Sequence, residues 1–466
     1  MRMPATPETI YARASGAGRA GVAVFRISGP RAFSIAEAMS GLLPDPKRAA
    51  LRPIREKSGA LIDEGLVLAF RGPASFTGED VVEYHLHGSP AVEAALAEAL
   101  AALGARPAEA GEFTKRALVN GKLDLAEVEG LADLLESETS RQRMQALGQL
   151  GGRLSEAAKG WRKRLLAIIA PLEADIDFPD EGGVPAAVAA RAGPEIDALV
   201  SELKSHQSAA RQAQAVREGV KVAIIGAPNA GKSSLLNRLA GSDRAIVSEI
   251  PGTTRDIIEV RLDLGGMLVS LFDTAGLREN SEDLIEIEGM KRTRRIAADA
   301  DIRVLMIDVS RETFQHGSVS RETNDPVFQP EVAENAGYGL SGERDFVVLN
   351  KIDLFPVPEA AGLSAGRRFG MSVRTGEGFD AFLAALTTAV ADLGRAEDAV
   401  LTRARHTEAV RYAIGFLETA REKIAEAPEL AAEDVRLAMR ALGRITGAVD
   451  VEDVLGEIFA SFCIGK

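Results

Sequence analysis

Residues 221–234 read KVAIIGAPNAGKSS, and this stretch decides how the rest of the chain is interpreted. Val222–Ile225 is an apolar run typical of a buried strand, Gly226–Ser233 has the spacing G-x-x-x-x-G-K-S, and helical spacing of leucines follows. In such a loop, backbone N–H groups converge on phosphate oxygens, and the helix N-terminus adds the positive end of its dipole. The order strand, glycine loop, helix therefore predicts a nucleotide site rather than a glycine turn without function.

Three side chains of this loop have expected roles. Lys232 can reach the β- and γ-phosphates, and Ser233 can ligate Mg²⁺. Asn229 has two readings on chemistry alone: its amide oxygen can ligate a monovalent cation beside the phosphates, or the residue only shapes the turn.

Two further motifs concern the metal and the γ-phosphate. Asp273–Gly276 (DTAG) follows the apolar strand Met267–Phe272, and an Asp at a strand end can hold Mg²⁺ through water while the glycine N–H senses a γ-phosphate. Gly252–Asp256 (GTTRD) supplies a threonine that can complete the Mg²⁺ coordination.

Base selection is expected from two motifs nearer the C-terminus. Asn350–Asp353 (NKID) follows the strand Phe346–Leu349, and an Asp carboxylate there can accept both N–H groups of guanine, a donor pair that adenine lacks. Ser372 and Val373 follow another short strand and fit the loop that contacts the guanine carbonyl. The five motifs have the order and spacing of a Ras-like GTPase.

The residue that orients the attacking water is not where it is in Ras-like proteins. Leu277, not Gln, follows the DTAG glycine, so this residue must come from elsewhere. Downstream candidates are four glutamates: Glu279, Glu282, Glu286 and Glu288.

The N-terminal region reads as a mixed α/β domain. Gly21–Ser28, Leu66–Phe70 and Val81–His87 have strand composition, and Ala91–Leu103 has helical spacing. On the last strand, the polar groups of Glu83, Tyr84, His85 and His87 favour one solvated face of a half-buried sheet. The two histidines can also indicate a metal, but no further His or Cys clusters near them in sequence.

The remaining chain is helical on both sides of the nucleotide domain. Asp175–Gly183 breaks the first helical block, and Val451–Phe462 presents one continuous apolar face with Asp450 as an expected N-cap. Neither block completes a core alone, so we expect one helical domain with the nucleotide domain inserted into it. Residues 310–342 are polar and repeat SRET, which favours an insertion.

Composition limits the other possibilities. The chain has 466 residues, 46% of them hydrophobic, a formal net charge of −13 and one cysteine, Cys463. The negative net charge disfavours a broadly basic nucleic-acid-binding surface, though not a local basic patch. With a single cysteine, an intramolecular disulfide is impossible. Without an apolar run of membrane-spanning length, we expect a cytoplasmic protein with no membrane partner.

Motifs across nearly the whole chain resemble the MnmE (TrmE) family of tRNA modification GTPases. The G-domain motifs are similar to those of potassium-activated GTPases that dimerise through their G domains. The motifs outside that domain are Ser75–Glu83, Ala110–Arg116, Asn120–Asp124, Ile176–Glu181 and the terminal SFCIGK at 461–466. The insertion at 310–342 has no counterpart in the family pattern.

The resemblance implies a fold and a domain order. The fold class is multidomain α/β and all-α. The expected parts are an N-terminal α+β folate-binding-like and dimerisation domain at 1–118, a discontinuous helical domain at 119–216 and 383–466, and an inserted Ras-like P-loop GTPase domain at 217–382.

The resemblance also implies an activity and partners. A K⁺-activated GTP hydrolase works with an MnmG-type FAD partner to form the 5-(carboxymethyl)aminomethyl group on the wobble uridine of tRNA. The one-carbon unit comes from a folate, 5,10-methylene- or 5-formyl-tetrahydrofolate. Mg²⁺ and K⁺ are the metals, GTP is the substrate, and a homodimer within a heterotetramer is expected.

Site residues follow from the resemblance position by position. Arg26, Glu83, Lys122 and Lys466 fall on folate-contacting positions, which moves Glu83 from a solvated residue to a binding residue. The role of Cys463 stays open: it can be a nucleophile or a buried thiol at a helix end. Glu286 matches the catalytic glutamate when counted from Gly289, whereas counting from Asp273 reaches Ile285 because of one extra residue.

The metal and nucleotide sets are carried over in the same way. The K⁺ ligands are Asn229, Ser248, Ile250 and Thr253, and the Mg²⁺ ligands are Ser233 and Thr254. The expected GTP-binding residues are Asn229, Ala230, Gly231, Lys232, Ser233, Ser234, Ser248, Thr253, Thr254, Asp273, Thr274, Ala275, Gly276, Asn350, Lys351, Asp353, Ser372 and Val373.

Two other functions use the same G motifs. A regulatory or ribosome-assembly GTPase switch lacks the folate-type N-terminal domain and the CIGK end. A folate-dependent transferase with a vestigial GTPase is disfavoured by five intact motifs.

Overall fold

The computed structural model describes most of the chain in two compact units. The first unit comprises Met1–Leu135, Leu147–Leu203 and Glu408–Lys466, and the second comprises Glu136–Ala146 and Lys204–Thr407. The described residues are 8–177, 185–246, 259–273, 298–310, 344–355, 367–395, 399–449, 458–459, 462 and 465.

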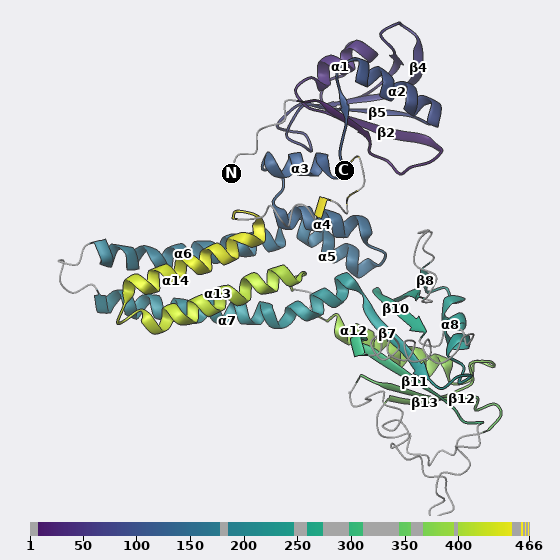
Figure 1. Ribbon diagram of the computed structural model, residues 1–466, viewed down its shortest axis with the longest axis vertical. Helices are drawn as coiled ribbons and strands as arrows, with labels where there is room; N and C mark the ends of the chain where they lie inside the picture. Colours follow the sequence, from purple (N-terminus) through teal and green to yellow (C-terminus); the bar gives the residue numbers. More distant parts are fainter. Residues whose placement is uncertain are drawn as a thin grey trace, which may run out of the picture. The chain divides into compact units, whose positions relative to one another are not determined.

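The first unit begins with a six-stranded sheet (Figure 1). Its neighbouring strands are antiparallel, except that β1 and β6 pair in parallel. In spatial order the strands are β3 (Ala49–Arg55), β4 (Leu61–Phe70), β5 (Val81–Gly88), β2 (Ala20–Ser28), β1 (Ile10–Arg13) and β6 (Arg106–Pro107). The three strands expected from sequence in this region are confirmed.

Two helices, α1 (Ala32–Ser40) and α2 (Pro90–Ala102), complete the core of this sheet. Side chains from β5 alternate, so Tyr84 and Leu86 are buried in that core while Glu83 and His85 lie on the opposite face. The expectation that Tyr84 shares a solvated face with Glu83 is therefore wrong, because adjacent strand residues point to opposite sides of the sheet.

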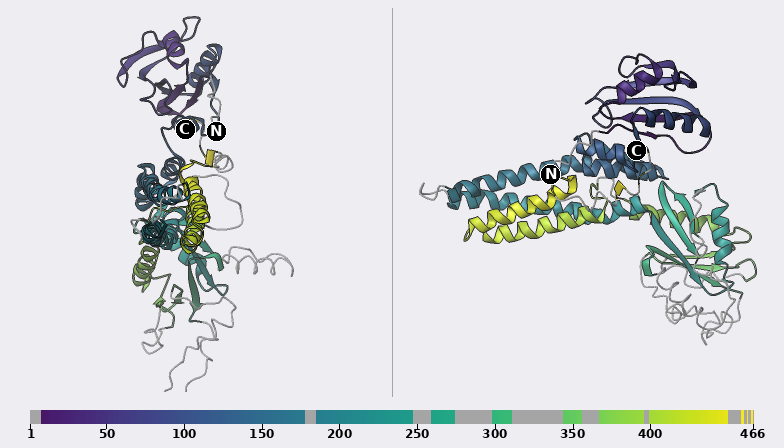
Figure 2. Two further views of the ribbon diagram at one scale, coloured as in Figure 1. Left: turned by 90° about the vertical axis from the view of Figure 1, so that its left-hand side faces the viewer. Right: turned by 45° about the horizontal axis from the view of Figure 1, so that its top comes forward.

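The rest of the first unit is helical. Its helices are α3 (Glu112–Val119), α4 (Leu125–Glu136), α6 (Arg153–Asp177), α13 (Ala404–Lys423) and α14 (Pro428–Thr446). The helices α5 (Ser140–Leu150) and α7 (Pro185–Glu218) are divided between the two units, and the ends of α4 and α13 also reach into the second unit. Helices α6 and α14 pack side by side, which Figures 1 and 2 both show. Among the described residues, no helix is long and apolar enough to cross a membrane.

Most of the expected C-terminal helix at 451–462 lies outside the described residues. Three of its apolar residues are described, and Ile458, Phe459 and Phe462 are buried with Leu125 and Val128 of α4. Of the insertion expected at 310–342, residues 311–342 also lie outside the described residues.

The second unit contains a seven-stranded sheet in the order β13-β12-β11-β7-β10-β9-β8. The strands from β13 to β10 are parallel, and β9 pairs antiparallel with β10. Their bounds are β13 (Arg367–Met371), β12 (Phe346–Asn350), β11 (Ile302–Asp308), β7 (Val220–Gly226), β10 (Met267–Asp273), β9 (Glu259–Leu264) and β8 (Ala245–Ile246).

Strand β7 is apolar along most of its length because both of its faces are buried. Val222 and Ile224 pack in the larger core with α8 (Lys232–Ala240) and α12 (Phe379–Leu393), while Ala223 and Ile225 pack on the opposite face. The carboxyl ends of the parallel strands meet at one edge of the sheet, where the glycine loop leaves β7.

Candidate functional site

The glycine loop joins β7 to α8, and two of its glycines cannot be replaced without strain. Gly226 has φ +145, and a Cβ there would lie 2.3 Å from the carbonyl oxygen of Met306. Gly231 has φ +102, and a Cβ would lie 2.2 Å from Nδ2 of Asn350. Both distances are below any real Cβ contact, so the close approach of the backbone requires glycine at both positions.

Lys232 lies inside this loop and is only 4% exposed. Its Nζ donates hydrogen bonds to the carbonyl oxygens of Gly226, at 2.8 Å, and Ala227, at 2.9 Å. Asn229 stands at the tip with φ +62. The ammonium group is thus held over the loop, where a bound anion can compete with the two carbonyls for it.

Ser233 and Asp273 are brought together from α8 and the end of β10. The Ser233 hydroxyl donates to Oδ2 of Asp273 at 2.7 Å, and the Asp273 side chain is nearly buried. A hydroxyl and a carboxylate oxygen at this separation are ligands of the type that Mg²⁺ prefers. The residues present therefore fit the metal expected from the sequence.

Asn350 connects the glycine loop to the loop after β13. Its Nδ2 donates to the carbonyl oxygen of Ala230 at 2.8 Å, and its Oδ1 accepts from the backbone N–H of Val373 at 3.1 Å. Both acceptor and donor of this buried amide are satisfied by backbone groups. Asn350 is thus a brace between two of the expected binding segments.

Asp353 and Ser372 form the part of the site expected to read a base. The hydrogen bond from the Ser372 side chain lowers the pKa of Asp353, and the nearby Arg374 lowers it further. Arg374 Nη2 lies 3.0 Å from Oδ2 of Asp353. A lowered pKa keeps this carboxylate ionised, and therefore an acceptor, as the pH falls below the usual range for Asp.

Lys351 has a second anionic partner that sequence reasoning did not identify. It has φ +70, and its Nζ lies 2.6 Å from Oδ2 of Asp308, at the end of β11. Burial would raise the pKa of Asp308, but hydrogen bonds from Lys351 and Ser310 outweigh it and lower the pKa. This ion pair fixes the position of Lys351 beside the NKID backbone.

Several expected site residues lie outside the described residues, and their roles stay predictions. They are Ser248, Ile250, Thr253, Thr254, Thr274, Ala275, Gly276, Glu286, Cys463 and Lys466.

A second polar site lies on the first unit, across strands β2 and β5. Arg26 faces Glu83 in the strand register, and its Nε and Nη2 donate to Oε1 of Glu83 at 3.0 and 2.9 Å. The guanidinium lies over the rings of Phe76 and Phe113, with its central carbon 5.4 and 5.7 Å from their centroids. The sequence placed Arg26 and Glu83 in one site, and the structure does bring them together.

Three further contacts concern His85 and the expected ligands Lys122 and Lys466. His85 Nε2 lies 3.5 Å from Oε2 of Glu83, and a Cβ at Gly78 would lie 3.3 Å from Cγ of the exposed Lys122. A Cβ at Gly465 would lie 2.0 Å from the carbonyl oxygen of Arg13, at the end of β1. The residue before Lys466 therefore lies against the strand next to β2.

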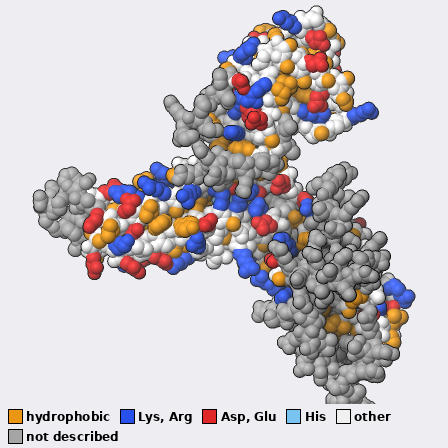
Figure 3. Space-filling view, in the orientation of Figure 1, with side chains coloured by type: hydrophobic (Ala, Val, Ile, Leu, Met, Phe, Trp, Pro, Cys, Tyr) orange, Lys and Arg blue, Asp and Glu red, His pale blue; other side chains and the backbone are white. Residues whose placement is uncertain are grey.

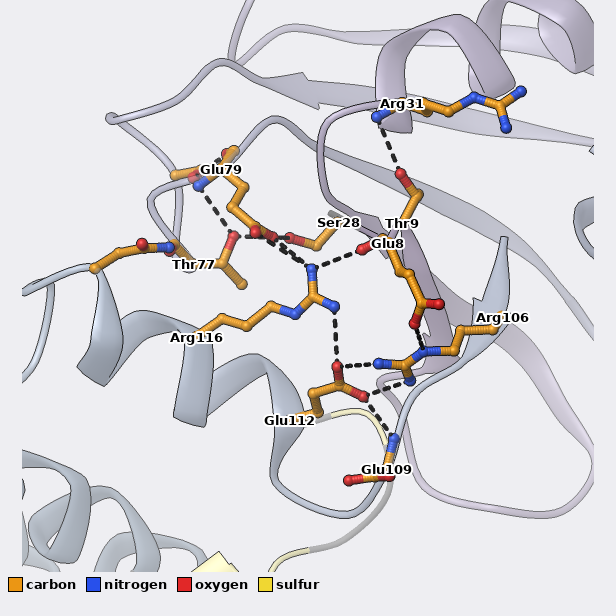
Figure 4. A network of polar contacts seen from close by, with 12 residues as sticks. Glu8, Thr9, Ser28, Arg31, Thr77, Glu79, Arg106, Glu109, Glu112 and Arg116 are labelled. Carbon is orange, nitrogen blue, oxygen red and sulfur yellow. Dashed lines mark hydrogen bonds and ion pairs between the residues drawn. The ribbon is translucent and has the colours of Figure 1, made fainter. Parts of the chain in front are cut away.

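An ion network centred on the buried Arg116 and Glu112 lies next to the segments that carry Phe76 and Phe113 (Figure 4). Arg116, which is 6% exposed, bonds Glu79 and Glu112, and Glu112 also pairs with Arg106. Burial would raise the pKa of Glu112, but hydrogen bonds from Arg106, the Glu109 amide and Arg116 lower it to about 2.

The network reaches the aromatic residues through their chain neighbours. Glu79 accepts from Ser28 at 2.8 Å, and Ser28 Oγ lies 2.8 Å from Oγ1 of Thr77, the residue after Phe76. Glu112 precedes Phe113. The chain neighbours of both rings beside Arg26 thus belong to one hydrogen-bonded network of charges. The sequence marked both segments as motifs, but their contact joins residues far apart in the chain.

Comparisons with known proteins were made for the whole chain. A family profile described as GTP-binding protein TrmE N-terminus matches residues 9–122, and one described as MnmE helical domain matches residues 125–463.

Curated relatives described as tRNA modification GTPase MnmE are similar over nearly their full length. The protein of Parvibaculum lavamentivorans is 49% identical, covering 98% of this chain and 100% of that protein. The protein of Caulobacter vibrioides is 48% identical with the same coverage of both, and that of Maricaulis maris is 46% identical, covering 98% and 99%.

Proposed function

The chain belongs to the MnmE family of tRNA modification GTPases, and from this premise we propose a function for each of its two sites. It hydrolyses GTP and, together with an MnmG-type FAD protein, forms the 5-(carboxymethyl)aminomethyl group on the wobble uridine of tRNA. A tetrahydrofolate supplies the one-carbon unit. The observation that carries this proposal is that one chain holds both the glycine-loop site and the Arg26–Glu83 pair.

At the glycine loop, each described side chain has a task that its contacts support. Lys232 exchanges its two carbonyl partners for the β- and γ-phosphates of GTP. Ser233 and Asp273 would hold Mg²⁺ together with Thr254, and the ion supplies charge neutralisation at the phosphates. Asp353 accepts from the guanine N–H groups, while Ser372 and Val373 border the base.

The cation and the glutamate that orients the attacking water belong to the same proposal. Asn229, Ser248, Ile250 and Thr253 would hold K⁺, which supplies positive charge where other GTPases use an arginine. Glu286 orients the attacking water. Faster GTP hydrolysis in KCl than in NaCl is the expected result, and equal rates in the two salts would contradict the K⁺ role.

At the second site, Arg26, Glu83, Lys122 and Lys466 would bind 5,10-methylene- or 5-formyl-tetrahydrofolate. Glu83 accepts from pterin N–H groups, and the cations face polar and anionic parts of the ligand. The Arg26–Glu83 pair, with two aromatic rings beside the guanidinium, suits a flat ligand with polar edges. We further propose a homodimer that assembles with the FAD protein into a heterotetramer in the cytoplasm.

The folate assignment predicts the effect of one isosteric change. Glu83→Gln removes the charged acceptor and the ion pair with Arg26, so 5-formyl-tetrahydrofolate should bind the full-length protein roughly tenfold more weakly. Isothermal titration calorimetry measures this change. Glu64→Gln, at an exposed position of β4, is the matched control and should bind normally. Equal affinity in both variants would reject Glu83 as a ligand.

The whole proposal is tested by nucleoside analysis of tRNA. A strain in which the gene is deleted should lack the 5-(carboxymethyl)aminomethyl uridine, and the gene supplied on a plasmid should restore it. A deletion strain with unchanged tRNA nucleosides would instead favour a regulatory GTPase without folate chemistry.

A further inference from the structure

Two packed helices of the first unit carry positive charge that the glycine-loop and folate sites do not use. Residues Ala157–Leu172 of α6 contain four Lys or Arg and no Asp or Glu, and residues Val435–Thr446 of α14 contain three and none. The chain as a whole has a net charge of −13. The two segments are therefore positively charged although the molecule as a whole is negatively charged.

Most of the cations of these segments are exposed. Arg440 and Arg444 are four residues apart on α14, and Lys159, Arg162 and Lys163 have the same one-turn spacing on α6. All five are exposed, and we call them the basic face. Figure 3 shows Lys and Arg side chains along these two helices, with Asp, Glu and hydrophobic side chains among them.

The relative position of the helices is fixed by their packing and by one ion pair. Arg436 of α14 lies 2.8 Å from Glu173 of α6, and the helices run in opposite directions in Figure 1. Counted from this ion pair, Arg440 and Arg444 lie one and two turns further along α14, beside the middle of α6. The two groups of cations therefore lie on neighbouring helices, within about three turns of each other along the helix axis.

Much of this charge is not neutralised within the protein. Lys159 pairs with Glu156 at 2.7 Å. Arg162, Lys163 and Arg440, by contrast, form no ion pair among the residues that the structure describes. Their charges face solvent and are available to an external anion.

The few exposed apolar side chains of the basic face favour a phosphate backbone over a protein or a lipid surface as its partner. Within the described parts of the two segments, Leu166 is the one exposed large apolar side chain, and no aromatic side chain is exposed. Protein interfaces concentrate aromatic anchors at their centre, and lipid surfaces require an apolar face to insert. Contacts to a phosphate backbone require only cations in a row.

We propose that the basic face binds the phosphate backbone of the tRNA that the complex modifies. This inference rests on the proposed function for the identity of the polyanion. Such contacts release counterions, so affinity should fall steeply with salt and depend little on tRNA sequence.

The test uses the full-length triple variant Arg162→Glu, Lys163→Glu, Arg440→Glu and a fluorescein-labelled tRNA transcript with a wobble uridine. Anisotropy titrations over a NaCl series should give a Kd at least ~10-fold higher than wild type and a salt slope lower by about 2–3, one contact per cation. GTP hydrolysis without tRNA and the thermal melting temperature should be unchanged.

The matched control has the same change in net charge at exposed positions elsewhere in the first unit, Arg48→Glu, Arg55→Glu and Arg411→Glu. Normal tRNA binding by this control supports a local contact, and equal weakening of both variants overturns the inference. Wild-type protein that does not bind the transcript at low salt also overturns it. So does a basic-face variant that binds tRNA normally but no longer assembles with the FAD protein.

Failure of this inference is distinguishable from failure of the proposed function. If the wild-type gene does not restore the modified uridine in the deletion strain, the proposed function fails. If the wild-type gene restores it and the triple variant both restores it and binds tRNA normally, only the basic-face assignment fails.

Discussion

Lys232→Ala should lower kcat/KM for GTP by on the order of 10²–10³-fold. The wild-type ammonium is held by the carbonyl oxygens of Gly226 and Ala227 at 2.8 and 2.9 Å, so it is already in place before nucleotide binds. Phosphoryl transfer relies on such positioned charge more than on covalent chemistry. Alanine removes the cation and leaves the two carbonyls without this donor.

The measurement is steady-state GTP hydrolysis together with equilibrium binding of a fluorescent GDP. Lys221→Ala, at an exposed lysine on β7, the strand before the glycine loop, is the matched control and should behave as wild type. A wild-type kcat/KM in the Lys232 variant, with its fold intact by circular dichroism, would remove Lys232 from the phosphate site.

Glu286→Ala separates binding from turnover in the same assay. If Glu286 only orients the attacking water, the variant keeps its affinity for GTP and loses hydrolysis, whereas the Lys232 variant loses both. Near-normal turnover would reject Glu286 and direct attention to the neighbouring glutamates. This residue lies outside the described residues, so its assignment depends on family spacing and the experiment carries particular weight.

The glycine-loop site was predictable from sequence because its motifs are contiguous and each follows a strand. Lys232, Ser233, Asp273 and Asn350 lie at the carboxyl ends of parallel strands or in the loops after them. The sheet brings those ends to one edge whatever the intervening residues are. For these residues, the place of each motif directly after a strand was therefore sufficient to predict that they lie together in one site.

The contacts of the N-terminal unit were less predictable, because they join distant residues. The family pattern named Arg26 and Glu83, but only the strand register shows that they bond each other directly. The ion network around Arg116 joins Glu79 and Glu112, which no local spacing relates. Strand alternation, in contrast, was available in the sequence and would have separated Tyr84 from Glu83.

Asp353→Asn should weaken GTP binding by on the order of 10²-fold. The wild-type carboxylate has two oxygens that can accept the two N–H groups of guanine. In the variant, the side-chain NH₂ replaces one of these oxygens and faces a guanine N–H group, so that hydrogen bond is lost. The wild-type carboxylate is kept ionised by the Ser372 hydrogen bond and by Arg374, both of which lower its pKa. GTP affinity of the wild type should therefore persist as the pH falls through the usual Asp range, and decline only below it.

Xanthosine triphosphate provides the decisive control for this assignment. Xanthine has a carbonyl where guanine has its exocyclic amino group, so the side-chain amide that Asp353→Asn introduces can donate an N–H to it. The variant should hydrolyse this nucleotide faster than GTP, while the wild type prefers GTP. A variant that loses both nucleotides equally would show that Asp353 supports the loop through Ser372 and Arg374 rather than reading the base. A reversal of preference can arise only from a direct contact with the base, because a loss of loop structure lowers both rates.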